Sequence, residues 1–263
     1  MIQIEPIHAF SDNFIWLLRR EQSNRAVVVD PGDAAPVLDT LKQEGLDLAA
    51  ILITHKHGDH VGGIERLLVA FPNAAVFGPA DEPIPGRQHA LSDGDRIQVP
   101  GIDADMQVFE VRGHTEGHIA YYCADNDPGV LFCGDTLFSV GCGRVFSGTF
   151  DQLHDSLMKI AALPDSTLAY CAHEYTLENI GFAKWVEPDN QALLDYEAQC
   201  HAKLAADENT VPSSLATEKS VNPFIRIHEA SVKQAVERHY GETYNDGRSL
   251  FRALRTWKDT EYD

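Results

Sequence analysis

The sequence predicts an α/β protein in which two sheets pack face to face with helices outside, followed by a smaller, mainly helical domain. As far as Cys171, short apolar or alternating runs typical of strands outnumber the helical patterns that lie between them. Beyond that residue the pattern becomes helical and no convincing strand follows. We therefore expect a first domain over residues 1–172 and a smaller, mainly helical domain over residues 173–263.

Turn signals separate the expected elements. Asp30-Pro-Gly closes one strand, the stretch before the strand at 106–111 is rich in Pro, Gly and Asp, and a hairpin is expected around Asp125–Gly129. The expected strands cover 2–7, 14–18, 26–30, 49–53, 74–78, 106–111, 119–123, 130–133 and 168–171. The expected helices cover 35–44, a segment that begins just after His60, 150–163, 191–206, 231–240 and 249–257.

Composition excludes several classes of protein. The formal net charge of -19 argues against a nucleic-acid partner and against anionic membranes, because both need a basic surface. No apolar stretch approaches the roughly 20 residues that span a bilayer, and the N-terminal residues lack the features of a signal peptide. The five scattered cysteines suggest buried free thiols rather than disulfides. We expect a cytoplasmic protein that acts as a monomer.

The stretch Thr54–His60 directly follows the expected buried strand at 49–53 and is dense in metal-ligand side chains. Residues two apart in an extended segment point to the same side, and Gly58 permits a sharp turn before the next pair. Imidazole and carboxylate together suit zinc, iron or manganese rather than calcium. A surface loop that happens to be rich in His and Asp is the less favoured alternative. The four candidate ligands are His55, His57, Asp59 and His60.

Three later strands each end in another candidate ligand, namely His114, Asp135 and His173. Ligands gathered from the ends of several strands form a rigid site. Seven ligands are too many for one tetrahedral zinc and match two metals that share a carboxylate. Asp30, at another strand end, is equally well interpreted as a residue that orients a ligand or as a turn-forming aspartate.

The motif Thr-His-x-His-x-Asp-His resembles the signature of the metallo-β-lactamase superfamily, which implies an αββα sandwich. The resemblance implies that His55, His57 and His114 hold one metal. It implies that Asp59, His60 and His173 hold the other, with Asp135 bridging. His118 is not a ligand in that pattern, and we expect it to support a ligand or to be structural. Two such metals would lower the pKa of a shared water to about 7 and so supply a hydroxide at neutral pH.

Cationic side chains offer a local exception to the acidic composition. Arg144 lies in the glycine-rich stretch that closely follows Asp135, so it could line the same cleft. Arg255 and Lys258 are three apart on an expected helix and therefore share a face. For this terminal pair the alternative is an ordinary solvated helix end.

Taken together, the motifs resemble glyoxalase II, the hydroxyacylglutathione hydrolase family, over essentially the whole chain. That resemblance implies hydrolysis of the thioester S-D-lactoylglutathione to D-lactate and glutathione, the second step of methylglyoxal detoxification. It also implies two divalent metal ions, zinc being preferred and iron or manganese the alternatives. The motifs are Thr54–His60, Gly113–His118, Phe132–Thr136, Gly141–Arg144, His173–Thr176, Asn222–Phe224 and the tail Arg255–Lys258.

The family resemblance also assigns roles around the thioester. Asp59 is expected to orient the hydroxide as well as to bind metal. Phe146 stands where some members have Tyr, so we expect one hydroxyl contact to glutathione to be missing and binding to be modestly weaker. The residues that match the family's glutathione contacts are Arg144, Tyr175, Arg255 and Lys258.

Three rival functions fit parts of the sequence. A glutathione-persulfide dioxygenase uses a similar fold with one iron, but it lacks most of the helical domain. A nuclease of the same superfamily would share the metal motifs, and the acidic composition argues against it. A non-catalytic metal-binding or scaffold protein would not need seven ligands and a substrate-binding lip.

Overall fold

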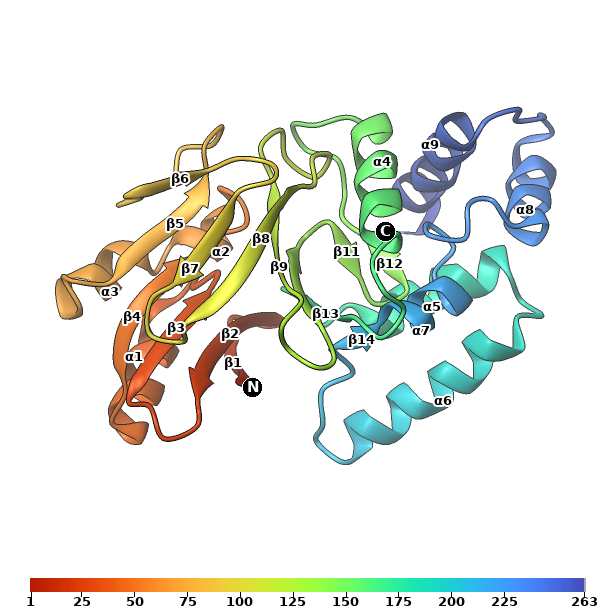
Figure 1. The fold of residues 1–263 in the computed structure, drawn as a ribbon. Helices are drawn as coiled ribbons and strands as arrows, with labels where there is room; N and C mark the ends of the chain where they lie inside the picture. Colours follow the sequence, from red (N-terminus) through yellow and green to blue (C-terminus); the bar gives the residue numbers. More distant parts are fainter. Residues whose placement is uncertain (263) are drawn as a thin grey trace. The chain divides into compact units, whose positions relative to one another are not determined.

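The computed structural model describes residues 1–262, which divide into two compact units (Figure 1). Each unit is discontinuous in sequence. The first consists of Met1–Glu110 and Thr115–Gly134. The second consists of Val111–His114 and the chain from Asp135 onwards. The first unit carries most of the strands and the second carries most of the helices.

The first sheet of unit 1 has the strand order β1-β2-β3-β4-β5-β6. Its first three strands pair antiparallel through tight connections, whereas β3 to β6 pair in parallel. Parallel pairing needs crossover connections, and helices supply two of them: α1 lies between β3 and β4, and α2 and α3 lie between β4 and β5. The bounds are β1 (Ile2–Ala9), β2 (Asn13–Arg20), β3 (Arg25–Val29), α1 (Ala34–Glu44), β4 (Asp47–Leu52), α2 (Gly58–Val61), α3 (Ile64–Ala70), β5 (Ala75–Pro79) and β6 (His89–Leu91).

Successive side chains of a strand point to opposite faces of the sheet. Ile15 and Leu17 of β2 lie in one apolar core with Val37 and Leu41 of α1. The intervening residues of β2, such as Trp16, are buried as well, so this strand is covered on both faces. Such double burial is expected for a sheet that carries helices on one face and a second sheet on the other.

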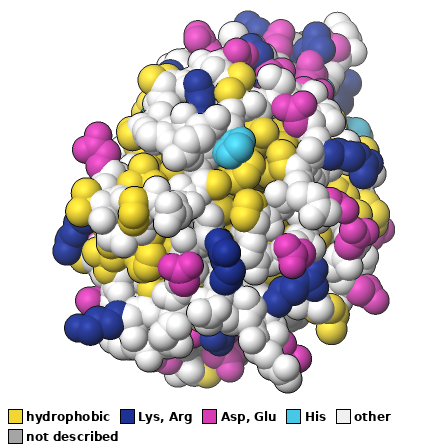
Figure 2. Space-filling model, turned by 60° about the vertical axis from the view of Figure 1, so that its left-hand side comes forward, with side chains coloured by type: hydrophobic (Ala, Val, Ile, Leu, Met, Phe, Trp, Pro, Cys, Tyr) yellow, Lys and Arg dark blue, Asp and Glu magenta, His cyan; other side chains and the backbone are white. Residues whose placement is uncertain are grey.

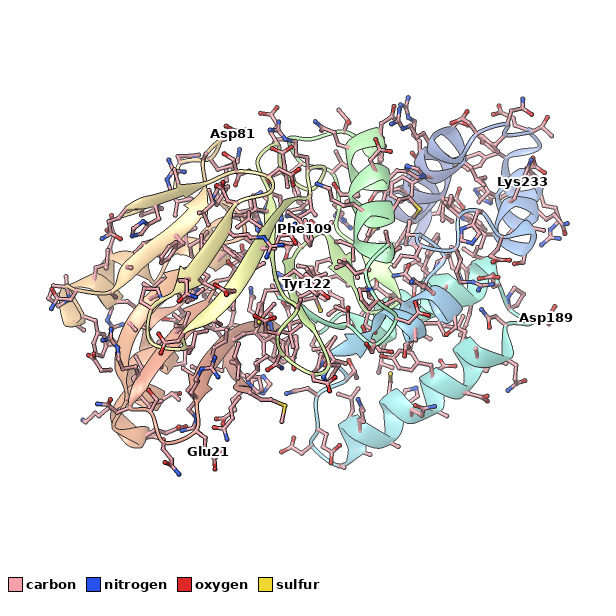
Figure 3. The ribbon with its side chains drawn as sticks, viewed as in Figure 1. Glu21, Asp81, Phe109, Tyr122, Asp189 and Lys233 are labelled. Carbon is pink, nitrogen blue, oxygen red and sulfur yellow. The ribbon has the colours of Figure 1, made fainter. Side chains whose placement is uncertain are left out.

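The second sheet of unit 1 is an antiparallel meander with the order β10-β9-β8-β7. Phe109 and Tyr122, labelled in Figure 3, stack on neighbouring strands with ring centroids 6.0 Å apart. The Tyr121 hydroxyl of β9 donates to the Ile53 carbonyl just after β4 at 2.8 Å, which joins the two sheets. The strands are β7 (Arg96–Val99), β8 (Ala104–Glu110), β9 (Ile119–Cys123) and β10 (Val130–Gly134).

The first regular elements of unit 2 are β11 and β12, which form a short hairpin. The elements that follow are mainly helices. Side chains at five helix starts accept a hydrogen bond from the first turn: Asp33 in unit 1, and Thr149, Asn190, Ser214 and Asp246 in unit 2. The elements of unit 2 are β11 (Leu137–Phe138), β12 (Gly141–Cys142), α4 (Phe150–Ala161), β13 (Leu168–Cys171), α5 (Thr176–Val186), α6 (Gln191–Ala205), β14 (Ser213–Ser214), α7 (Leu215–Val221), α8 (Ala230–Tyr240), α9 (Gly247–Trp257) and a π-helix, η1 (Lys258–Tyr262).

Some sequence predictions of individual elements were wrong. The turn-rich stretch before β8 contains β6 and β7, which are only three and four residues long and partly exposed. The two-residue strand β14 pairs with β13 beyond Cys171, where no strand was expected. The helix expected after His60 begins earlier, because α2 includes His60 itself. Helix α5 was not predicted since it is buried on several sides and lacks a clear apolar stripe.

The expectation of buried free thiols is confirmed. All five cysteines are free and buried. Within residues 1–262, no helix has the length and apolar character needed to cross a membrane. On the face drawn in Figure 2, Lys and Arg side chains are interspersed with Asp and Glu rather than gathered in one basic patch.

Candidate metal centre

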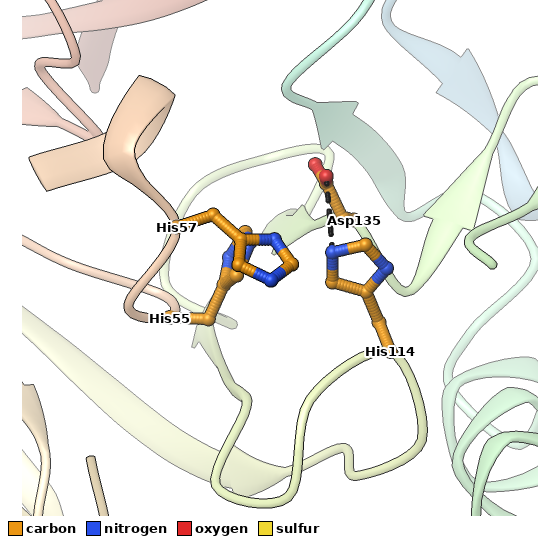
Figure 4. Close-up of side chains that lie close together, drawn as sticks. All are labelled: His55, His57, His114 and Asp135. Carbon is orange, nitrogen blue, oxygen red and sulfur yellow. Dashed lines mark hydrogen bonds and ion pairs between the residues drawn. The ribbon is translucent and has the colours of Figure 1, made fainter. Parts of the chain in front are cut away.

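The ligand loop of unit 1 leaves β4 and runs into α2, as its strand-then-helix pattern predicts. His55 Nε2 lies 3.0 Å from His57 Nδ1, and Figure 4 shows both side chains. Two neighbouring donors on a tetrahedral zinc lie about 3.3 Å apart, given Zn–N distances of about 2.0–2.1 Å. The two nitrogens are therefore spaced as two ligands of one ion.

Asp30 orients two of these imidazoles. Its carboxylate accepts hydrogen bonds from the Thr54 amide at 2.8 Å and from the Thr54 hydroxyl at 2.7 Å. Because that hydroxyl donates to Asp30, it accepts from His55 Nδ1 at 3.1 Å, which assigns the lone pair of the ring to Nε2. Asp30 also lies 3.0 Å from His60 Nδ1, with the same consequence for His60. These contacts support the interpretation of Asp30 as a residue that orients ligands, and Asp30 also lies in a turn, with a φ of 52°.

The turn at Asp30 is pressed against the ligand loop. A Cβ atom on Gly32 would lie 1.8 Å from the backbone oxygen of Asp59, so no larger residue fits there. Asn13 donates from Nδ2 to Asp59 Oδ2 at 3.0 Å, and that oxygen lies 3.5 Å from His60 Nε2. The close approach of Gly32 and the hydrogen bond from Asn13 therefore fix Asp59, whose Oδ2 lies beside the His60 ring.

Two further residues support the loop. The buried His118 ring stacks on His55 with centroids 4.6 Å apart and an interplanar angle of 18°, so it packs against a candidate ligand. The buried Glu82 accepts from the Lys56 amide at 2.7 Å and from the Gly117 amide at 3.0 Å. Sequence reasoning missed Glu82, because it lies in a turn-rich stretch with no ligand-like spacing.

The candidate ligands of unit 2 meet at Asp135. Its Oδ2 atom lies 3.4 Å from His114 Nε2, the contact dashed in Figure 4, and 3.5 Å from His173 Nε2. His114 Nδ1 donates to the Arg144 carbonyl at 2.8 Å, which directs the lone pair of Nε2 towards Asp135. One carboxylate oxygen therefore lies at nearly equal distances from two candidate imidazole ligands.

Aromatic side chains flank this cluster. The Tyr175 ring lies parallel to His173, with centroids 4.8 Å apart and an interplanar angle of 8°. Phe146 is 65% exposed and meets the His114 ring edge-on at 5.2 Å. Phe146 therefore presents an apolar surface beside a candidate ligand, where a tyrosine would present a hydroxyl.

The cations predicted to bind substrate differ in exposure. Arg144 is exposed, with Nε 3.9 Å from Asp259 Oδ1. Arg255 is fully buried, and its guanidinium donates to the Cys142 carbonyl at 3.2 Å and pairs with Asp259 at 3.0 Å. Lys258 is buried as well, so the alternative of a solvated helix end is wrong. Burial raises the pKa of the Cys142 thiol to about 11 although Arg255 opposes the shift.

The donor set fits divalent transition metals. Each unit holds a compact His/Asp cluster with imidazole nitrogens and carboxylate oxygens, a chemistry that suits zinc, iron or manganese. The structure brings together His55, His57, Asp59 and His60 in unit 1, and His114, Asp135 and His173 in unit 2.

Known proteins match both parts of the sequence. Residues 10–173 match the family described as "Metallo-beta-lactamase superfamily", and residues 174–261 match "Hydroxyacylglutathione hydrolase C-terminus". A hydroxyacylglutathione hydrolase of Pseudomonas fluorescens (strain SBW25) is 51% identical over 260 residues, which cover 98% of this chain and 99% of the relative. One of Aliivibrio salmonicida (strain LFI1238) is 51% identical over 260 residues, with the same coverage.

Solved structures share the fold at lower identity. ETHE1 from Myxococcus xanthus aligns with a TM-score of 0.65 at 23% identity, over 98% of this chain and 97% of that one. TTHA1623, solved in a di-iron-bound form, aligns with a TM-score of 0.54 at 28% identity, over 64% of this chain and 91% of that one. The predicted fold class, a metallo-β-lactamase fold with a helical C-terminal region, is confirmed.

Proposed function

Because this chain belongs to the hydroxyacylglutathione hydrolase family of the metallo-β-lactamase superfamily, we propose that it hydrolyses S-D-lactoylglutathione to D-lactate and glutathione. The observation that carries this proposal is the match of the helical region at 174–261, which extends the likeness beyond the metal-binding fold to the part expected to bind substrate. This thioester hydrolysis would be the second step of methylglyoxal detoxification.

The seven candidate ligands would hold two divalent ions, with zinc preferred. His55, His57 and His114 would bind one ion, and Asp59, His60 and His173 would bind the other. Asp135 would serve both, which its position between the His114 and His173 rings supports. When bound, such a pair supplies a water of lowered pKa and polarises the thioester carbonyl.

The chain's own residues would position the reactants. Asp59, whose Oδ2 receives a hydrogen bond from Asn13, would orient the attacking water through its carboxylate. Arg144, Tyr175 and Lys258 would bind the glutathione part, remote from the thioester. Arg255 would support these glutathione-binding residues, since its buried guanidinium donates to the Cys142 carbonyl and pairs with Asp259. The departing thiol has an ordinary pKa of about 8.5, so no dedicated general acid is needed.

We place the enzyme in the cytoplasm. Five free, buried cysteines fit a reducing compartment, where disulfides rarely persist. That it acts as a monomer remains a prediction.

The direct test measures thiol release from S-D-lactoylglutathione by the metal-loaded full chain. A small lactoyl thioester without the glutathione part serves as the matched substrate control. We expect rapid hydrolysis of the first and a much lower kcat/KM for the second, because the glutathione contacts supply binding energy. Equal kcat/KM for both thioesters, or no hydrolysis of either, would contradict the proposal.

A further inference from the structure

The turn that joins β11 to β12 has an unusual backbone. Val140 adopts a φ of 61°, a left-handed conformation that β-branched residues rarely take. The side chain is nevertheless buried, in one apolar cluster with Ile180 of α5, Leu193 of α6 and Val221 of α7. The turn is therefore inserted into the core of the helices that follow it, and those helices must hold it in a strained form.

Three side chains from these helices satisfy the backbone of the turn. Asn179 of α5 donates from Nδ2 to the Ser139 carbonyl at 3.1 Å. Asn222, at the end of α7, donates from Nδ2 to the Gly141 carbonyl at 2.9 Å. Glu218 of α7 accepts the Val140 amide at 2.9 Å through Oε2.

Glu218 is the centre of this arrangement. The same Oε2 atom accepts from Asn222 Nδ2 at 2.9 Å, so one carboxylate oxygen ties the turn to the residue that holds its other end. Glu218 is fully buried, and its other oxygen, Oε1, makes no hydrogen bond within the described residues. The two bonds that Oε2 accepts favour a single conformation of the turn.

The turn is flanked on both sides by site residues. Asp135 lies two residues before β11, and Gly143 and Arg144 follow β12. The Gly143 amide donates to the Thr136 carbonyl at 3.3 Å, and a Cβ on Gly143 would lie 1.9 Å from the Asp135 carbonyl oxygen. The Arg144 carbonyl in turn accepts from the His114 ring. A displaced turn would thus move both a candidate bridging carboxylate and a candidate substrate cation.

We propose that Glu218 is a positioning residue, which with Asn179 and Asn222 locks the 138–141 turn and thereby sets Asp135 for metal binding and Arg144 for substrate binding. The metal and substrate parts of this inference rest on the proposed function. The helical region would then fix the positions of Asp135 and Arg144, in addition to contacting glutathione.

The matched control is Glu187, a second buried carboxylate of the same unit. Its bonds go to Arg226 at 2.9 and 3.0 Å and to Ser231 at 2.5 Å, and none of these partners touches the turn. Glu218→Leu and Glu187→Leu each remove a buried, hydrogen-bonded carboxylate, so general destabilisation should be common to both. Glu218→Gln is the conservative variant, because an amide oxygen in the Oε2 position still accepts from Val140 and Asn222, and the amide nitrogen replaces only Oε1, which makes no hydrogen bond within the described residues.

The experiment uses the zinc-loaded full chain and three readouts: hydrogen exchange at the Val140 amide, zinc transfer to a competing chelator, and KM with kcat on S-D-lactoylglutathione. Glu218→Leu should speed exchange about tenfold or more, weaken zinc retention by about 10–100-fold and raise KM. Glu218→Gln should stay within about twofold of wild type in all three. Glu187→Leu should lower the melting temperature and leave zinc retention and KM within about twofold.

The proposal is wrong if folded Glu218→Leu retains zinc and binds substrate like wild type, or if Glu187→Leu weakens zinc retention equally. Should Glu218→Leu fail to fold, Asn179→Ala removes a single bond to the turn and must shift the same readouts in the same direction. Unchanged readouts in that variant would overturn the proposal. If wild type does not hydrolyse the substrate, the proposed function fails, while exchange and zinc transfer still decide whether the turn is locked.

Discussion

At the scale of single residues, Asp135 contacts two candidate ligands through one oxygen atom. Its Oδ2 lies 3.4 Å from one imidazole nitrogen and 3.5 Å from another, close to the spacing of about 3.3 Å between neighbouring donors on a tetrahedral ion. Since the same oxygen satisfies that spacing to both rings, its removal should disturb two ions rather than one.

We therefore predict that Asp135→Ala lowers kcat by more than about a hundredfold, because even a residue that only supports a ligand costs up to about that much. Zinc per chain after dialysis should fall by more than one equivalent. Asp165→Ala, a change at an exposed aspartate of the same unit, should alter neither quantity. Retention of both ions with near-normal turnover would show that Asp135 does not bridge.

Asp30 supports the same candidate metal centre through its contacts with Thr54 and His60. Asp30→Asn keeps the shape and tolerates the φ of 52°, but it loses the charge that faces Thr54 and His60. We predict that zinc affinity, measured by chelator competition, falls about 10–100-fold. Asp33→Asn is the control in the same turn, because asparagine caps α1 as well as aspartate does. Equal zinc affinities in the Asp30→Asn and Asp33→Asn variants would show that Asp30 does not orient metal ligands.

Lys258 and Arg255 should give different phenotypes although both match glutathione contacts. Lys258→Ala removes binding remote from the thioester, so KM should rise about tenfold with kcat nearly unchanged. Arg255→Ala should in addition lower the free energy of unfolding by about 2–3 kcal/mol, since it breaks buried charge-assisted hydrogen bonds. Steady-state kinetics and urea denaturation separate the two effects. Lys233→Ala, at a half-exposed lysine of α8, is the control, and an unchanged KM in Lys258→Ala would exclude Lys258 from the substrate site.

At the scale of elements, two buried glutamates should respond to pH in opposite directions. Burial raises the pKa of Glu218 above its ordinary 4.5, so its contribution to stability is present below that value and is lost as pH rises towards the folded pKa. For Glu187 burial acts in the same direction, but Arg226 and Ser231 outweigh it and lower the pKa. Its contribution is present above 4.5 and is lost as pH falls below it.

Unfolding of matched variants across pH measures these contributions. Relative to wild type, Glu218→Gln should gain stability as pH rises above about 4.5. Glu187→Gln should gain relative stability as pH falls below about 4.5. If the stability difference between each variant and wild type does not change with pH, then neither glutamate has the shifted pKa described above.

Local patterns made much of this fold predictable. The alternation in β1 and the apolar runs of β2 to β4 located the strands, and the His-rich loop after β4 located the ligands. Contacts over long sequence separations were not predictable. Glu82 reaches Lys56 and Gly117, and Val140 has a left-handed conformation in a turn whose amide is bound by Glu218 of a later helix. Neither fact leaves a periodic or motif-like trace near the residue concerned.

At the scale of the whole molecule, the charge of -19 has to be reconciled with an anionic substrate. The cations assigned to substrate are few: Arg144 is exposed, Lys258 is buried, and the supporting Arg255 pairs with Asp259. A small local excess of positive charge inside a repelling field favours binding that depends strongly on ionic strength.

The central claim is that two metal ions, held by ligands from strand ends, enable hydrolysis of a glutathione thioester. The most direct measurement is the initial rate of S-D-lactoylglutathione hydrolysis as metal-free protein receives increasing equivalents of zinc, iron or manganese, with bound metal determined by elemental analysis. We predict that activity rises with the second ion and reaches its plateau at about two equivalents per chain. Full activity with a single tightly bound iron, or no hydrolysis with two ions bound, would contradict this account.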